Sequence, residues 1–173
     1  MKLEELIRNV PDFPIKGIQF KDITTLLKNA AGFDEALELF YNSAKNLGIT
    51  KVVGIESRGF IFGGALAAKL NAGFVPIRKP NKLPAEKLSQ EYQLEYGIDK
   101  IEIHKDAIGE GDIVLMHDDL LATGGTMLAA CKLVESLGGK IVQIQFLIEL
   151  DFLNGREKLN SYNVNSLIHY SEE

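Results

Sequence analysis

Short, continuous apolar runs recur along the chain and are separated by longer mixed stretches. The runs are "KVVGI" (51–55), "FVPIR" (74–78), "DIVLMH" (112–117) and "KIVQIQFLI" (140–148). Uninterrupted apolar runs of this length are typical of strands that are buried on both faces of a parallel sheet. The pattern therefore predicts four core strands.

Three of the mixed stretches have helical spacing. Residues 34–47 repeat apolar side chains every three or four positions, and Gly48 is placed to end that helix. A second helix, rich in small residues, is predicted over about 60–70, and a third carries its apolar side from Met127 to Leu137. Strands that alternate with helices predict an α/β fold with a mostly parallel, twisted sheet flanked by helices. Ligands of such sheets bind at the carboxyl ends of the strands.

A long polar segment, "KPNKLPAEKLSQE" (79–91), interrupts this alternation. It is followed by "YQLEYG" (92–97), where large and polar residues alternate, and by the short run "KIEIH" (100–104). The alternation favours a strand or hairpin arm with Glu95 on its polar face. A loop this long inside a compact domain is usually functional or mobile.

Composition and charge narrow the class of protein. The length of 173 residues fits one domain over 1–173, and the net charge of −5 argues against a general nucleic-acid binder. The single cysteine, Cys131, excludes an intramolecular disulfide and fits a reducing compartment. The charged start "MKLEELIRNV" is unlike a signal peptide, and no apolar run is long enough to span a bilayer. We expect a cytoplasmic protein without a membrane or nucleic-acid partner.

The segment "ATGGT" (122–126), called the phosphate loop below, leaves an apolar strand and leads into a helix. Thr123, Gly124, Gly125 and Thr126 are predicted to occupy the first helical turn. Backbone N–H groups and the helix dipole favour a phosphate there, and glycine lets the backbone approach it closely. Neither the nucleotide-kinase pattern nor the dinucleotide-binding glycine pattern is present in the sequence.

Two acidic residues, Asp118 and Asp119, precede the phosphate loop. Ionised carboxylates only accept hydrogen bonds, so the pair suits a ligand with hydroxyls close to its phosphate, such as ribose 5-phosphate. Two anions beside a sugar also suit a reaction in which positive charge builds on the ring. The alternative is that the pair forms turns and N-caps at the end of a strand.

Basic residues follow two of the predicted strands. Arg58, in "ESRGF" (56–60), can bind phosphate bidentately, while Glu56 or Ser57 orients the turn. Arg78, Lys79 and Lys82 cluster after the next strand and suit a polyanion such as pyrophosphate. The alternative for both groups is an ordinary solvated surface.

Four segments in this order resemble the type I phosphoribosyltransferases. "VPDFPIKGIQFKDITTLL" (10–27) is similar to the family's N-terminal hood, and "ESRGFIFG" (56–63) is similar to its pyrophosphate loop. "RKPNKLP" through "YQLEYG" (78–97) is similar to the flexible loop. "DDLLATGGT" (118–126) is similar to the signature for phosphoribosyl pyrophosphate (PRPP). The resemblance covers nearly the whole chain.

The resemblance implies the type I phosphoribosyltransferase fold, with a hood at about 1–30 and a flexible loop at about 79–97. It further implies transfer of phosphoribose from PRPP to N9 of adenine, giving AMP and pyrophosphate in purine salvage. Enzymes for hypoxanthine and guanine carry an aspartate where this chain has Ala122. Enzymes for xanthine or another purine, and a PRPP-sensing regulator without turnover, remain alternatives.

Matching positions imply a role for each motif residue. The 5-phosphate would be bound by Ala122, Thr123, Gly124, Gly125 and Thr126, the ribose by Asp118 and Asp119, pyrophosphate by Ser57, Arg58, Arg78, Lys79 and Lys82, and adenine by Gln19, Phe20, Arg58 and Leu120. Glu95 matches the family's loop carboxylate, which is proposed to manage a purine-ring proton. The alternative for Glu95 is an ordinary exposed strand glutamate.

The resemblance also implies Mg²⁺, held mainly by PRPP itself, and a homodimer. Four positions depart from the family pattern: Lys21 where arginine is frequent, Thr25 where proline is common, Asn81 in place of a glycine, and His117 in place of an apolar residue. We interpret His117 as a strand-end histidine at the margin of the site.

Overall fold

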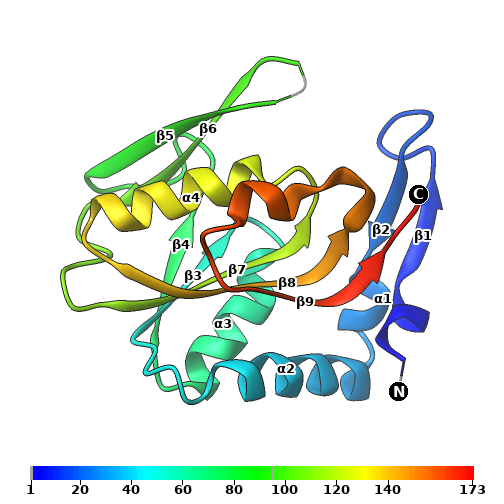
Figure 1. Ribbon diagram of the computed structural model, residues 1–173, viewed down its shortest axis with the longest axis horizontal. Helices are drawn as coiled ribbons and strands as arrows, with labels where there is room; N and C mark the ends of the chain where they lie inside the picture. The colour runs from blue at the N-terminus through cyan, green and yellow to red at the C-terminus, as the bar shows by residue number, and fades with distance from the viewer. Residues whose placement is uncertain (1, 95) are drawn as a thin grey trace.

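The computed structural model describes residues 2–94 and 96–173. A five-stranded parallel sheet forms its centre, and two antiparallel hairpins stand at its periphery (Figure 1). The strands are β1 (Arg8–Pro11), β2 (Gln19–Asp22), β3 (Lys51–Ile55), β4 (Gly73–Ile77), β5 (Lys87–Gln93), β6 (Ile98–His104), β7 (Ile113–Leu121), β8 (Lys140–Leu150) and β9 (Val164–Tyr170). The helices are η1 (Leu3–Leu6), α1 (Thr24–Leu27), α2 (Ala30–Ala44), α3 (Gly59–Lys69), α4 (Gly125–Ser136), η2 (Asp151–Leu153) and η3 (Gly155–Leu159).

The central sheet has the order β4-β3-β7-β8-β9, with every neighbouring pair parallel. The four predicted core strands and the α/β class are thus confirmed. The prediction for β7 was too short, since this strand continues through both acidic residues to Leu121. The fifth strand, β9, was not predicted.

Helices cover both faces of this sheet, so the molecule has two apolar cores. On one face, α4 packs Met127, Cys131 and Val134 against the strands, and on the other, α2 and α3 contribute Phe40 and Phe62 (Figure 1). All five side chains are buried, so Cys131 is a core residue. No helix among the described residues is both long and apolar enough to cross a membrane.

The helix boundaries follow local signals in the sequence. The side chain of Asn29 accepts a hydrogen bond from the N–H of Gly32 at 3.0 Å and so caps α2, which starts four residues before its predicted position. The helix ends at Ala44 rather than Leu47, and Gly48 follows with a φ of +70°. The predicted helix over 60–70 agrees with α3 to within one residue.

A hairpin arm is present as β5 and β6, but its first strand lies earlier than predicted, since β5 begins at Lys87, within the segment predicted as a polar loop, and ends at Gln93. The two strands pair antiparallel from Lys87 opposite His104 to Gln93 opposite Ile98. The arm lies over α4 (Figure 1) and is joined to the end of β4 by two backbone hydrogen bonds between Arg78 and Glu102. Glu95, the predicted catalytic residue, lies outside the described residues.

The hood is a hairpin of β1 and β2 beside η1 and α1. Lys21 is buried, and its Nζ lies 4.4 Å from the ring centroid of Tyr170 in β9. Thr25 donates a hydrogen bond to the carbonyl of Leu6 at 2.6 Å, a contact that a proline could not make. These two departures from the family pattern therefore tie the hood to η1 and to the central sheet.

Candidate active site

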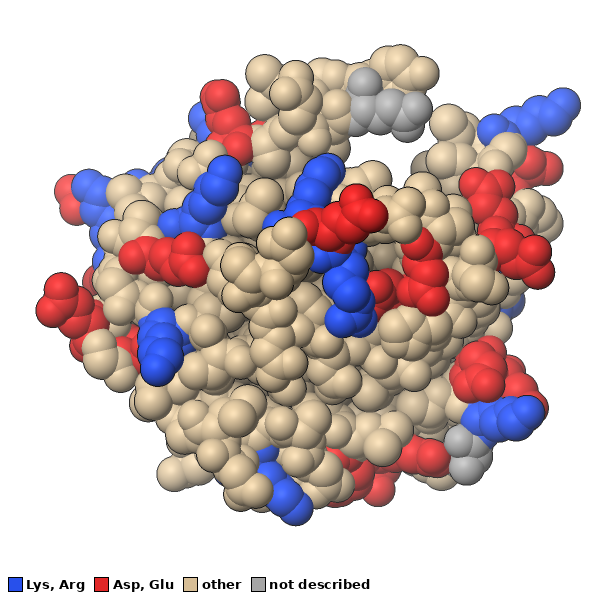
Figure 2. Space-filling model, viewed as in Figure 1, with Lys and Arg blue, Asp and Glu red and all other residues tan. Residues whose placement is uncertain are grey.

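Several of the predicted site residues converge at the carboxyl ends of β3 and β7. A pocket of about 350 Å³ opens there, with Ser57, Arg58, Asp118, Asp119 and Leu120 among its lining residues. Acidic and basic side chains are interspersed over the face shown in Figure 2. The pocket lies where ligands bind in open parallel sheets, as the sequence predicted.

Asp118 and Asp119 both lie within β7, so neither caps the helix that follows. Asp119 is 6% exposed, and its Oδ2 lies 2.7 Å from Nε of Arg58. Asp118 accepts the N–H of Asp119 through Oδ1 at 2.8 Å. Burial and the neighbouring Asp119 raise the pKa of Asp118 well above its usual range, and burial also raises the pKa of Asp119. A cation beside the pair would lower both pKa values and so favour the ionised carboxylates, which accept hydrogen bonds from hydroxyl donors.

The phosphate loop runs from the end of β7 to the start of α4. Gly124 adopts a φ of +84° and stands at the N-cap, so α4 begins at Gly125 and Thr123 precedes its first turn. The first N–H groups of a helix have no partner within it and point outward. A small pocket of about 80 Å³ lies against the loop and shares Asp118, Leu120 and Thr126 with the larger one. One continuous surface thus joins the loop to the acidic pair.

Glu56 holds the start of the flexible loop. Its Oε1 accepts the backbone N–H of Lys79 at 2.6 Å and lies 3.3 Å from Nε of Arg78. Arg78 and Lys82 are not among the described residues that line the pocket, and Lys82 is exposed. Of the three basic residues predicted to bind pyrophosphate from this loop, the structure brings only Lys79 to the pocket.

The side chain of Lys79 is held by the hairpin arm. Its Nζ donates to the hydroxyl of Tyr92 at 2.9 Å and forms an ion pair with Asp99. Asn81 has a φ of +65°, the left-handed region that glycine favours and asparagine tolerates, and its N–H is bonded to Glu102 at 2.8 Å. The loop therefore keeps the backbone shape of a glycine-containing loop in spite of this departure.

The residues predicted to bind adenine come from the hood and from β7. The guanidinium carbon of Arg58 lies 4.9 Å from the ring centroid of Phe20, and Phe13 packs edge-on against that ring at 5.1 Å. Gln19 accepts a hydrogen bond from the side chain of Asn9 at 2.8 Å. Arg58 thus connects Phe20 to Asp119, the residue before Leu120.

The interpretation of His117 as a residue at the site margin was wrong. The ring is fully buried, and its centroid lies 5.1 Å from that of Phe40 on the opposite face of the sheet from α4. Side chains alternate along a strand, so the residue next to Asp118 points to the other face. Neither ring nitrogen has a hydrogen-bond partner among the described residues, and burial lowers the pKa of His117 to about 3.

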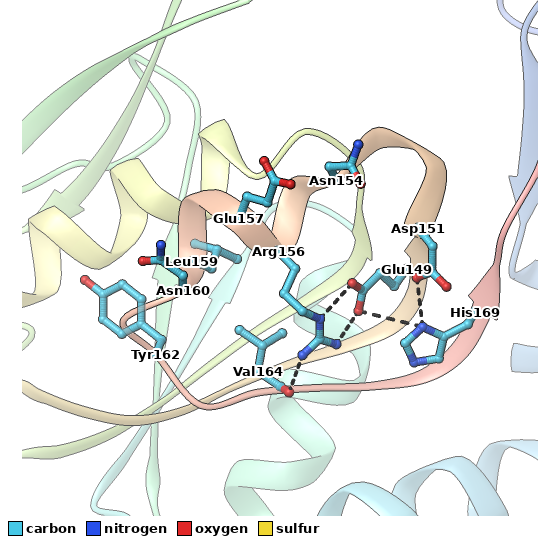
Figure 3. Close-up of a pocket in the computed structure, with 10 residues that line it drawn as sticks. All are labelled: Glu149, Asp151, Asn154, Arg156, Glu157, Leu159, Asn160, Tyr162, Val164 and His169. Atoms are coloured by element: carbon cyan, nitrogen blue, oxygen red, sulfur yellow. Dashed lines mark hydrogen bonds and ion pairs between the residues drawn. The ribbon is translucent and has the colours of Figure 1, made fainter.

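A second pocket, of about 640 Å³ and called the rear pocket below, is lined by residues from the end of β8, from β9 and from the η2 and η3 segment between them (Figure 3). Within the described residues, Glu149, Asp151 and His169 are the one group whose geometry could hold a metal ion. Arg156 already binds both carboxylate oxygens of Glu149, and Nδ1 of His169 lies 2.9 Å from Asp151, so the group forms an ion-pair network. The sequence analysis missed it, because its members belong to no recognised motif.

The comparisons with known proteins agree with this geometry. A model of the phosphoribosyl transferase domain family matches residues 22–168. The adenine phosphoribosyltransferase of Flavobacterium johnsoniae is 56% identical over 98% of this chain and 100% of its own length. The crystal structure of the adenine phosphoribosyltransferase from Thermoanaerobacter pseudethanolicus superimposes with a TM-score of 0.94 at 54% identity, covering 97% of this chain and 98% of that one. The enzyme from Giardia lamblia, solved with 9-deazaadenine, gives 0.93 at 44% identity over 98% and 97%.

Proposed function

Because the chain belongs to the phosphoribosyltransferase family, we propose that it is an adenine phosphoribosyltransferase, which transfers phosphoribose from PRPP to N9 of adenine. The products are AMP and pyrophosphate, with inversion at the anomeric carbon. The observation that carries the proposal is the buried acidic pair between a phosphate loop and an arginine that contacts the hood. Relatives at 56% and 54% identity bear the same name.

In this proposal the phosphate loop binds the 5-phosphate of PRPP, and Asp118 and Asp119 accept hydrogen bonds from the ribose hydroxyls. The shared surface between the two pockets supports this arrangement, since it joins the loop to the acids. As the bond to pyrophosphate breaks, positive charge builds on the ring. Fixed carboxylates beside the sugar stabilise that charge.

Pyrophosphate would contact Ser57 and Arg58 and the basic residues of the flexible loop, Arg78, Lys79 and Lys82. Lys79 would exchange its contacts with Tyr92 and Asp99 for the anion. Arg78 and Lys82 would reach the anion only after the loop moves.

Adenine would lie between Phe20 and Leu120, with Gln19 and Arg58 at its edge. The position of Arg58 beside the ring of Phe20 supports this site, because a flat base could stack on the same ring. Ala122, in place of an aspartate, disfavours the 6-oxopurines. Glu95 would accept or supply the purine-ring proton, since closure of the loop would desolvate it and raise its pKa toward a useful value.

We also propose that the enzyme uses Mg²⁺ and acts as a cytoplasmic homodimer of single-domain subunits. Asp118 and Asp119 fit a hard cation, because their carboxylates are oxygen ligands at the pocket and carry raised pKa values that a nearby positive charge would lower. The acidic pair would hold the ion through water. When bound with PRPP, the ion offsets negative charge on the diphosphate.

The proposal is tested by mixing the purified protein with PRPP and Mg²⁺ and assaying adenine, hypoxanthine, guanine and xanthine separately for pyrophosphate release. We expect turnover with adenine alone. Turnover with an oxopurine would mean that Ala122 and the hood were misinterpreted. PRPP binding without turnover of any base would indicate the regulator instead.

A further inference from the structure

The phosphate loop rests directly on the backbone of η3. A Cβ atom built on Gly124 would lie 2.5 Å from the carbonyl oxygen of Gly155, and one built on Gly155 would overlap the carbonyl oxygen of Ala122. No side chain fits between these two segments. The position of Gly155 therefore fixes the position of the loop from behind.

Gly155 is in turn held by its neighbour Arg156. The guanidinium donates through Nε to Glu149 at 2.9 Å, binds the second oxygen of that carboxylate through Nη2, and donates through Nη1 to the carbonyl of Val164 at 2.9 Å (Figure 3). A bidentate arginine–carboxylate pair fixes direction as well as distance. Arg156 thus ties η3 to both β8 and β9.

Glu149 is the fixed end of this connection. It lies opposite Leu121, the residue before the phosphate loop, and its side chain is 6% exposed. The hydroxyl of Ser166 donates to it at 2.6 Å. Burial would raise the pKa of Glu149, but the hydrogen bonds from Arg156 and Ser166 lower it overall, so the carboxylate is charged.

We propose that Glu149 and Arg156 are positioning residues for the 5-phosphate, although neither residue lines the pockets that contain the phosphate loop. Their ion pair presses Gly155 against Ala122 and Gly124 and holds the N–H groups of the loop in the geometry that receives a phosphate. The inference rests on the proposed function. It predicts that loss of the ion pair weakens binding of the 5-phosphate end of PRPP and leaves binding of the pyrophosphate end largely unchanged.

The test compares Arg156→Met and Glu149→Gln with the parent protein by calorimetry, using ribose 5-phosphate and, separately, pyrophosphate with Mg²⁺. We expect either change to weaken ribose 5-phosphate binding about tenfold, because small misplacements of a preorganised site are costly. Pyrophosphate affinity should stay within about twofold, and the double variant should lose no more than the larger single loss, since the pair acts as one unit.

Glu157→Gln is the matched control, because Glu157 lies in η3, lines the same rear pocket and makes no ion pair or side-chain hydrogen bond among the described residues. It should leave both affinities unchanged. Equal loss of affinity for both ligands in Arg156→Met would overturn the inference and indicate general destabilisation. Unchanged affinity for both ligands would also overturn it. If Arg156→Met fails to fold, Glu149→Gln decides alone, since it keeps the shape of the side chain. A parent protein that binds no ribose 5-phosphate would instead contradict the proposed function.

Discussion

Arg58 is the residue at which the hood, the acidic pair and the turn after β3 meet. It directly precedes α3, pairs with Asp119 at 2.7 Å and lies beside Phe20 at 4.9 Å. In the proposed function one guanidinium therefore borders both the base and the leaving group. Asp119 is buried and Arg58 is only partly exposed, so solvent screens their ion pair weakly. Removal of either charge would leave the other without its partner, which is costly at a buried site.

Replacement of both acids, Asp118→Asn with Asp119→Asn, should weaken PRPP binding about tenfold or more. Hydrogen bonds to charged acceptors contribute more than those to neutral amides. Calorimetry with PRPP and Mg²⁺ measures the change. Asp112→Asn is a suitable control, since Asp112 precedes the opposite end of β7 and pairs with Lys51. Unchanged PRPP affinity in the double variant would refute the assigned role.

Glu95→Gln should lower turnover about 10²-fold or more and leave PRPP affinity largely intact. The reason is that loss of a general acid or base slows proton transfer without removing a substrate contact. Single-turnover rates with adenine and calorimetry with PRPP separate the two effects. Equal turnover in the variant and the parent would remove Glu95 from the mechanism.

His117 makes the stability of the protein sensitive to acid. Its pKa is about 3 in the folded protein and 6.5 in a solvated chain, so between these values the unfolded state binds the additional proton. Stability is therefore lost as the pH falls below about 6.5, by about 2 kcal/mol at pH 5 from this group alone. Urea unfolding of His117→Leu should show a loss between pH 7.5 and pH 5 that is smaller by this amount.

At the scale of elements, the arm of β5 and β6 contains the second half of the flexible loop and holds the loop's first residues. Asp99 and Tyr92 on the arm hold Lys79, and Glu102 accepts hydrogen bonds from Asn81 and Ser89. The ion pair lowers the pKa of Asp99. Both groups are therefore charged at neutral pH, and in the proposed function pyrophosphate would compete with Asp99 for Lys79.

Asp99→Asn should strengthen pyrophosphate binding several-fold, because Lys79 would no longer have to break its ion pair with a carboxylate before it binds the anion. An ion pair of this exposure contributes about 1 kcal/mol or less, which corresponds to an effect of up to about fivefold in affinity. Calorimetry with pyrophosphate and Mg²⁺ measures it. Asp106→Asn removes one charge from an exposed site and controls for the net charge of the protein. Weaker binding in Asp99→Asn would show that Asp99 supports the site rather than restraining Lys79.

At the scale of the whole molecule, the sequence predicted the parallel core because strands buried on both faces carry apolar residues at every position. The same property left the direction of the His117 side chain unpredicted. When both faces of a strand are buried, polar and apolar residues do not alternate, so the sequence does not show which face a side chain occupies. β9 escaped prediction because Asn165, Ser166 and His169 interrupt its apolar residues. The pair of Glu149 and Arg156 is a tertiary contact between common residue types, and no local pattern indicates it.

The contact between Lys21 and Tyr170 joins the first hairpin of the chain to its last strand. Chains emerge from the ribosome with the N-terminal part first, so the hood is synthesised early. Lys21 can contact Tyr170 only after β9 has been synthesised. The phosphate loop and α4 precede β9 and are synthesised sooner. In the proposed function, the base-binding side therefore gains one of its anchoring contacts only when the last residues of β9 have been synthesised.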